Sequence, residues 1–362
     1  MNKATTVENP LGYERVGRLL ARYAIPSIIA LIINSLYNMV DQIFIGQGVG
    51  FLGNGATNII APIATITIAI ATLFGDGLAA FFSLSLGKGE GEKAAKGLGR
   101  SIIYGSIFGI IWTVIAFAFL RPLCLIFGAT ENILPYALDY GRIIVIGFAF
   151  QIVGNTINSA IRTDGSPRYA MLSMMIGAIL NIILDPIFIF VFHWGVEGAA
   201  IATIISQLFG LLFNIAYLFR MKTIKLSRQS FTFDIRTAGR IASLGFASGA
   251  NNLTSTVVTF VSNNLMTKYG ALSPYGADIP LTTFGLCMKV SMLAFSIGIG
   301  VASGSQPIIG FNYGAKKYGR VKKTFLLGAG VATIITFVSW IIFQCFPLQL
   351  IRILPGHPAI QD

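Results

Sequence analysis

Long apolar runs dominate this sequence and restrict it to a membrane fold. A helix that crosses the hydrocarbon core of a bilayer needs about 20 apolar residues. Only 11% of the 362 residues are charged, whereas a soluble domain carries about a quarter, so polar groups could not cover its surface in water. The sequence predicts an all-α integral membrane protein. Its nine predicted spans are 19–46, 53–86, 97–120, 134–161, 168–192, 197–219, 237–267, 279–310 and 324–350.

Most of the 26 Lys and Arg residues fall on one side of these spans. Cytoplasmic loops of multi-pass proteins carry such an excess, so we place the N-terminus in the cytoplasm and the chain in the cytoplasmic (inner) membrane. The net charge of +12 therefore reflects the membrane topology of the chain. No nucleic-acid partner is expected, because no basic stretch is interleaved with aromatic residues. The three cysteines lie far apart and predict no metal site.

Two turns rich in Gly and Lys predict an internal repeat of six helices. SLGKGEGEKA at 85–94 follows the second span, and NYGAKKYGRV at 312–321 follows the eighth. The simpler alternative is that short cytoplasmic loops favour these residue types. A parallel repeat predicts a two-lobe helical bundle with an incomplete second lobe. Its parts are a cytoplasmic N-terminal segment (1–18), a first lobe of six spans (19–220), a cytoplasmic linker (221–236) and a partial second lobe (237–362).

Three acidic residues, Asp41, Asp76 and Asp185, lie well inside predicted spans. A charge buried in a bilayer costs at least about 2.5–3.5 kcal/mol, so each is a functional candidate. Asp41 and Asp185 fall at the same predicted depth, and Tyr37 and Asn181 precede them by four residues on the same helix faces. This set predicts a site for a desolvated cation or a shared proton. The alternative is that neighbouring hydroxyl groups satisfy both acids in a purely structural role.

Four motifs carry a resemblance to a known family. They are YNMVDQIFIG at 37–46, NIILDP at 181–186, GVEGAAIAT at 195–203 and GSQPIIGFNYGA at 304–315. Together with the parallel repeat, they make the chain resemble the bacterial branches of the multidrug and toxic compound extrusion (MATE) family of exporters. The likeness runs from the first span to the last residue. The family has twelve spans, three more than this chain carries.

The resemblance implies site residues and a function. The positions that match Asp41, Asn181, Asp185 and Thr203 line a coupling site in the first lobe of family members, and Asn158 is a possible neighbour of that network. The implied function is a Na⁺- or H⁺-coupled antiporter that exports amphipathic or cationic drugs and toxic metabolites. It implies no enzyme activity and no cofactor beyond Na⁺ at Asp41 and Asp185 or a transported H⁺. We expect a monomer.

Further residues have two readings each. Asp76 faces the cavity and attracts cationic substrates, or it is a partnered structural acid. Lys289 pairs with an acid across the lobes, or it extends toward the membrane surface. Gln151 is predicted to line the substrate cavity together with Asp76 and Lys289. It shares a stripe of the fourth span with Asn155 and Asn158, where hydrogen bonding between helices is the simpler reading.

Three alternative functions stay open. A lipid-linked oligosaccharide flippase of the same superfamily would carry basic residues in its cavity, and only Lys289 qualifies. An intramembrane enzyme such as a prenyltransferase would need clustered aspartates for Mg²⁺, and the sequence has no such cluster. A truncated remnant that transports nothing is the third, because nine spans are fewer than the family's twelve.

Overall fold

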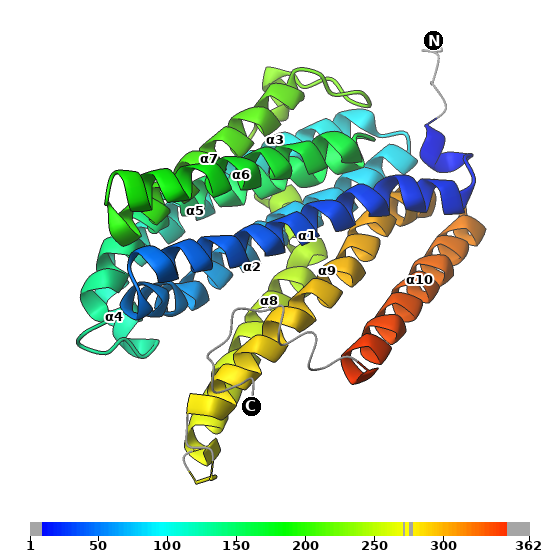
Figure 1. Cartoon of the computed structure of the whole chain (residues 1–362). Coiled ribbons are helices and arrows are strands. Elements are labelled where there is room, and N and C mark those ends of the chain that lie inside the picture. The colour runs from blue at the N-terminus through cyan, green and yellow to red at the C-terminus, as the bar shows by residue number, and fades with distance from the viewer. Residues whose placement is uncertain (1–8, 271, 275–277, 346–362) are drawn as a thin grey trace, which may run out of the picture.

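The computed structural model describes residues 9–270, 272–274 and 278–345, and all regular secondary structure in that part of the chain is helical (Figure 1). The α-helices are α1 (Val16–Gly48), α2 (Phe51–Gly87), α3 (Gly91–Ala118), α4 (Leu120–Ile126), α5 (Leu134–Thr163), α6 (Pro167–Pro186), α7 (Gly195–Leu218), α8 (Ile235–Gly270), α9 (Asp278–Gly314) and α10 (Tyr318–Cys345). Three short helical turns accompany them: η1 (Pro10–Gly12), which precedes α1, the π turn η2 (Ile187–Val191) and η3 (Arg228–Ser230).

Eight helices in the described part of the chain are long and apolar enough to cross a membrane, one fewer than the nine predicted. The difference is the predicted span 237–267. It is helical as α8, but its mean hydropathy is too low because Asn, Ser and Thr interrupt it. The short helix α4 was not predicted, since its seven residues continue the apolar run of α3. Helix ends differ from the predicted ones by up to six residues, as at the start of α3.

The helices form two lobes (Figure 1). The first contains α1–α7, and its core lies where α2 and α5 pack together, with Ile60, Ile63 and Phe148 fully buried. The second contains α8–α10. We call the end at which α1 begins the basic end. In Figure 1, α9 meets α1 at this end, and the two helices separate toward their other ends.

Small residues allow the lobes to touch closely at the basic end. A side chain added at Gly77 of α2 would meet the backbone of Ile241 in α8, and one added at Gly245 of α8 would meet the backbone of Leu73 in α2. Gly304 of α9 packs in the same way on the backbone of α1. Such contacts between glycine faces are how helices approach closely in a bilayer. We call this contact of α1 and α2 with α8 and α9 the seam.

Hydrogen bonds mark the far limit of the seam. The Ser35 hydroxyl lies 3.0 Å from that of Ser296 between α1 and α9, and Asn252 of α8 donates to the Thr72 hydroxyl of α2 at 3.2 Å. Both pairs lie near the middle of their helices. Beyond these pairs α1 and α9 diverge toward the end opposite the basic end (Figure 1).

The segment between α7 and α8 is bound to the first lobe at two points. At the first, the Asp164 carboxylate is 1% exposed and accepts hydrogen bonds from the backbone N–H groups of Lys222 and Thr223 at 2.7 and 2.9 Å. The hydroxyls of Tyr217 and Thr223 also donate to it. A buried carboxylate surrounded by donors of this kind fixes the segment that bonds to it.

At the second point, Arg100 of α3 lies 2.8 Å from an Asp234 oxygen and donates to the Thr237 hydroxyl at 2.8 Å. The hydrogen bond from Thr237, assisted by the backbone N–H of Arg236 and the charge of Arg100, lowers the pKa of Asp234. Asp234 therefore stays ionised where it binds Arg100, and this pair sets the start of α8 against the first lobe.

We expect Asp164→Ala to lower the free energy of unfolding by about 3 kcal/mol, because several buried donors lose their acceptor. Thermal unfolding of the detergent-solubilised protein measures this. Asp139→Ala is the matched control: Asp139 forms an exposed pair with Arg142, 3.9 Å apart, and its loss is expected to change stability by less than about 0.5 kcal/mol. Equal stability of the two variants would show that Asp164 does not hold the segment.

Candidate functional site

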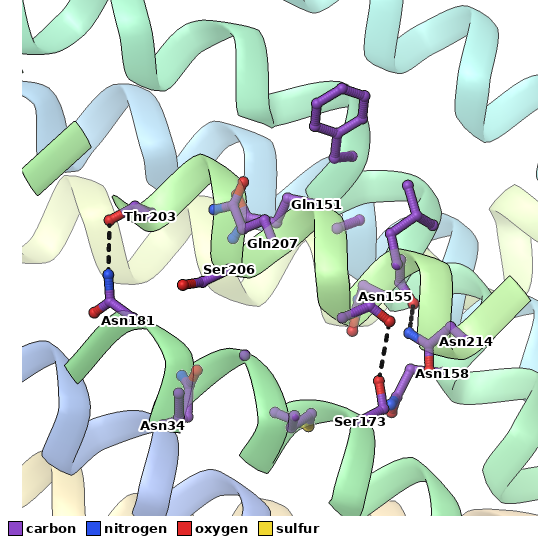
Figure 2. Close-up of a pocket in the computed structure, with 18 of the residues that line it drawn as sticks. Asn34, Gln151, Asn155, Asn158, Ser173, Asn181, Thr203, Ser206, Gln207 and Asn214 are labelled. Carbon is purple, nitrogen blue, oxygen red and sulfur yellow. Dashed lines mark hydrogen bonds between the residues drawn. The ribbon is translucent and has the colours of Figure 1, made fainter. Parts of the chain in front are cut away.

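The first lobe contains a cavity of about 330 Å³ between α1, α2, α5, α6 and α7 (Figure 2). Carboxamide and hydroxyl groups supply its polar lining, and Leu31, Ile68, Phe150 and Met174 are among its apolar residues. None of the lining residues is Asp, Glu, Lys, Arg or His. The polar residues labelled in Figure 2 are Asn34, Gln151, Asn155, Asn158, Ser173, Asn181, Thr203, Ser206, Gln207 and Asn214.

Several oxygen acceptors of this cavity are buried without a hydrogen-bond partner among the described residues. They are Asn181 Oδ1, Ser206 Oγ, Gln207 Oε1 and Asn214 Oδ1. The amide nitrogens of Asn158, Asn181 and Asn214, in contrast, donate hydrogen bonds, as when Asn214 Nδ2 donates to the Gly154 carbonyl at 3.0 Å. Because buried acceptors without donors cost free energy, the cavity is suited to a ligand that supplies N–H or O–H groups.

Two carboxyl groups lie at one end of this cavity. Asp185 of α6 is fully buried, and its Oδ1 accepts a hydrogen bond of 3.1 Å from Asn181 Nδ2. Asp41 of α1 lies opposite, close enough for the two carboxyl groups to interact directly. In the described part of the chain, Asp41 Oδ1 and Asp185 Oδ2 have no hydrogen-bond partner. The pair thus offers free oxygen atoms in an environment where uncompensated charge is costly.

The backbone next to Asp185 is irregular. Helix α6 ends at Pro186, and the chain continues as the π turn η2. Proline lacks an N–H group and clashes with the carbonyl four residues earlier, so it interrupts the regular hydrogen-bond ladder. Single π turns occur frequently at functional sites, where they change the direction of side chains. The NIILDP motif therefore places its acid at a break in the helix.

The structure brings most predicted coupling residues together. Asn181 Nδ2 also lies 3.3 Å from the Thr203 hydroxyl of α7, so Thr203 joins Asp185 through Asn181. Tyr37 lines the cavity one turn before Asp41. Asn158 lines it too, but its amide donates to the Ala170 carbonyl at 2.9 Å. Ala170 precedes Asn181 by about 16 Å along α6, so no direct bond links Asn158 to Asp185.

The three residues predicted for the substrate cavity have separate places. Gln151 lines the cavity. Asp76 is not among the lining residues: its carboxylate lies 4.0 Å from Arg162 of α5, and its backbone carbonyl accepts a hydrogen bond from Gln306 of α9 at 2.9 Å. The side chain of Lys289 lies outside the described residues.

Sequence reasoning missed several members of this region. Tyr140 of α5 is buried and interacts electrostatically with Asp41 and Asp185. Its helix was recognised, but nothing in the spacing shows which face of α5 meets α1. Ser206, Gln207 and Asn214 of α7 also line the cavity. The sequence did indicate them, because polar residues recur along this otherwise apolar span.

The comparisons with known proteins agree with this architecture. The family model MatE matches residues 26–187 and 247–361. This chain belongs to the MatE family. It is therefore a multi-pass membrane protein of a family of multidrug efflux transporters, as the motifs implied.

Relatives within the MatE family are moderately distant. Multidrug export protein MepA of Staphylococcus haemolyticus (strain JCSC1435) is 26% identical over 355 residues, which cover 95% of this chain and 73% of MepA. A MOP superfamily transporter from Pyrococcus furiosus has the same fold, with a TM-score of 0.89 at 24% identity over 97% of this chain and 77% of its own. An outward-facing multidrug resistance MATE transporter gives 0.88 at 24% identity, over 96% and 76% of the two chains. The chain spans about three quarters of these proteins.

Proposed function

We propose that this chain exports amphipathic or cationic small molecules from the cytoplasm, driven by the entry of Na⁺ or H⁺. The observation that carries the proposal is the facing pair of carboxyl groups, fully buried Asp185 and half-buried Asp41, whose Oδ1 atom is itself buried. Two like charges that interact directly repel strongly in a medium of low dielectric constant. A cation between them, or a proton on one of them, removes that repulsion, so the pair responds to ion or proton binding.

The available donors suit such a cation. Hard cations are bound by carboxylate, amide and hydroxyl oxygen atoms. Asp41 Oδ1, Asp185 Oδ2 and Asn181 Oδ1 are buried oxygens without hydrogen-bond partners among the described residues. Asp41 is on α1 and Asp185 on α6, so occupation of the pair changes the attraction between two helices. The coupling ion would in this way bias α1, which also carries much of the seam with the second lobe.

The uncharged cavity fits the proposed substrates. Its free carbonyl oxygens accept hydrogen bonds from ammonium or amide N–H groups, and Leu31, Ile68 and Phe150 contact apolar ring systems. A flippase for phosphate-bearing lipids would need basic side chains here, and the lining has none. We therefore favour drug export over the flippase alternative.

The proposal includes an orientation and a direction. We place the basic end in the cytoplasm, following the excess of Lys and Arg there. The end at which α1 and α9 diverge then faces the outside, and we propose that substrate is released there. The lobe boundaries of the prediction, 19–220 and 237–362, and a monomeric state are part of this proposal.

Uptake of ethidium into inverted membrane vesicles tests the proposal. A Na⁺ gradient and a pH gradient are imposed separately, each with its higher cation concentration inside the vesicle, the side that corresponds to the cell exterior. We expect one of them to drive uptake and dissipation of that gradient to stop it. Vesicles with Asp139→Asn, which changes an exposed acid outside the site, serve as the matched control and are expected to behave as wild type. Absence of uptake under both gradients would refute cation-coupled export.

A further inference from the structure

The turn η1 before α1 is held by residues of the second lobe. Asn312, at the end of α9, donates from Nδ2 to the Leu11 carbonyl at 2.9 Å. Lys317 Nζ donates to the Gly12 carbonyl at 3.0 Å. Arg320 of α10 donates from one terminal nitrogen to the carbonyls of Leu11 at 3.2 Å and Glu14 at 2.6 Å. Every donor comes from the second lobe, and every acceptor is a backbone carbonyl that precedes the first span.

The donors are fixed before they meet these carbonyls. Asn312 is fully buried, and its Oδ1 accepts a 3.0 Å hydrogen bond from Arg320 Nε, which orients the guanidinium. Lys316 has a φ of 59°, a left-handed conformation that reverses the chain between α9 and α10. The N–H of Lys317 closes this turn by donating to the Asn312 carbonyl at 2.8 Å. The sequence NYGAKKYGR thus forms one rigid unit.

An apolar contact supports the same junction. Leu11 is 2% exposed and packs with Leu19, Leu20, Tyr23 and Ile308. Ile308 belongs to α9, so both the side chain and the carbonyl of Leu11 bind the second lobe. Hydrogen bonds from charged donors are stronger than neutral ones, and these lie at the edge of a buried cluster rather than in open water.

We propose that Asn312, Lys317 and Arg320 form a latch that holds the basic end of the two lobes closed. Any movement that separates α1 from α9 at this end must break its bonds, because donors and acceptors belong to different lobes. Arg320 is the central positioning residue, since it bonds to two carbonyls and to Asn312. The direction of transport assigned to this closure rests on the proposed function, but the closure itself does not.

Cysteine labelling at the seam tests the latch. In a variant whose Cys124, Cys287 and Cys345 are replaced by serine, Ser83→Cys places a thiol at a fully buried position of α2 that faces Gly310 of α9. The rate of its reaction with N-ethylmaleimide in inverted vesicles reports opening of the seam. We expect Arg320→Ala to raise this rate by about tenfold, since the loss of a charge-assisted hydrogen bond corresponds to at least that ratio.

Three controls make the result decisive. Lys323→Ala, which changes an exposed cation of the same helix, is expected to leave the rate unchanged. Thr156→Cys, buried inside the first lobe against Gly105, is expected to stay unreactive in the Arg320→Ala protein. If the thiols of both Ser83→Cys and Thr156→Cys become reactive in Arg320→Ala, the labelling rates are measured in Lys317→Ala instead. This variant removes only one bond, made by an exposed side chain. Faster labelling of Ser83→Cys alone in that variant supports the latch, and an unchanged rate overturns it.

An unchanged rate at Ser83→Cys in both Arg320→Ala and Lys317→Ala also overturns the latch. Labelling needs no ion gradient and no transported substrate. If the vesicle experiment refuted cation-coupled export, the labelling result for the latch would still hold. If the labelling experiment overturned the latch, the proposal of cation-coupled export would still hold.

Discussion

Asp185→Asn is expected to abolish ethidium efflux while the protein remains in the membrane at its normal level. Asparagine has nearly the shape of aspartate and keeps an oxygen for the Asn181 amide, so the bond at this position survives. Asparagine carries no charge, so the variant lacks the repulsion from Asp41 that a cation or proton relieves. Burying such a charge costs about 2.5–3.5 kcal/mol. If this free energy no longer drives transport, the rate of cation-coupled efflux is expected to fall roughly 100-fold.

The same result is expected for Asp41→Asn, and the double variant should be no worse than either single one. Residues that act as a unit give such non-additive losses. Rates of ethidium efflux from cells, normalised to the amount of protein in the membrane, measure this. Asp139→Asn is the matched control, because its carboxylate lies on α5 in an exposed pair. Full efflux by both Asp41→Asn and Asp185→Asn would rule out coupling through the first lobe.

The contact between Asn181 and Asp185 was predictable from the sequence because local spacing ties the two residues. Asn181 and Asp185 are four residues apart, so one helical turn brings them together without knowledge of the fold, and the structure joins them by a hydrogen bond. Thr203 was implied by the family resemblance, and the short connection between α6 and α7 brings its hydroxyl within 3.3 Å of the Asn181 amide. The all-helical membrane fold followed from the length and composition of the apolar runs.

Contacts between distant helices were not predictable in this way. Asp164 stands at the end of a predicted span and looks like a loop residue, yet it accepts bonds from a segment more than 50 residues later. The bonding partner of Asn158 was not predictable for a related reason. Its depth on α5 and its bond to Ala170 depend on how α5 slides along α6, and a single sequence contains no measure of that offset.

The seam illustrates the same limit, because the sequence shows its glycines but not which helix each one faces. Gly239, Gly249 and Gly245 all lie in α8. A methyl group added at Gly239 meets nothing within 4 Å, at Gly249 it lies 3.1 Å from the Ala69 carbonyl oxygen, and at Gly245 it overlaps the backbone of Leu73. The structure thus ranks three chemically identical substitutions by what they contact.

We expect Gly→Ala at these positions to change stability in that order. Gly239→Ala should stabilise the protein by about 0.5–1 kcal/mol, since alanine favours the helix. Gly249→Ala should be close to neutral, as helix propensity and a tight contact offset one another. Gly245→Ala should destabilise it by about 1–3 kcal/mol, because backbone atoms of α2 cannot move aside as a side chain would. Thermal unfolding in detergent measures all three.

The seam gives Gly245→Ala a second expected effect. Forcing α2 and α8 apart separates the lobes at the end where they touch, so the thiol of Ser83→Cys should react faster with N-ethylmaleimide in this variant than in Gly239→Ala. Ethidium efflux should fall in parallel, because a transporter that cannot close one end cannot alternate between its two open states. If Gly245→Ala were as stable and as active as Gly239→Ala, the close contact between α2 and α8 would not be part of the working protein.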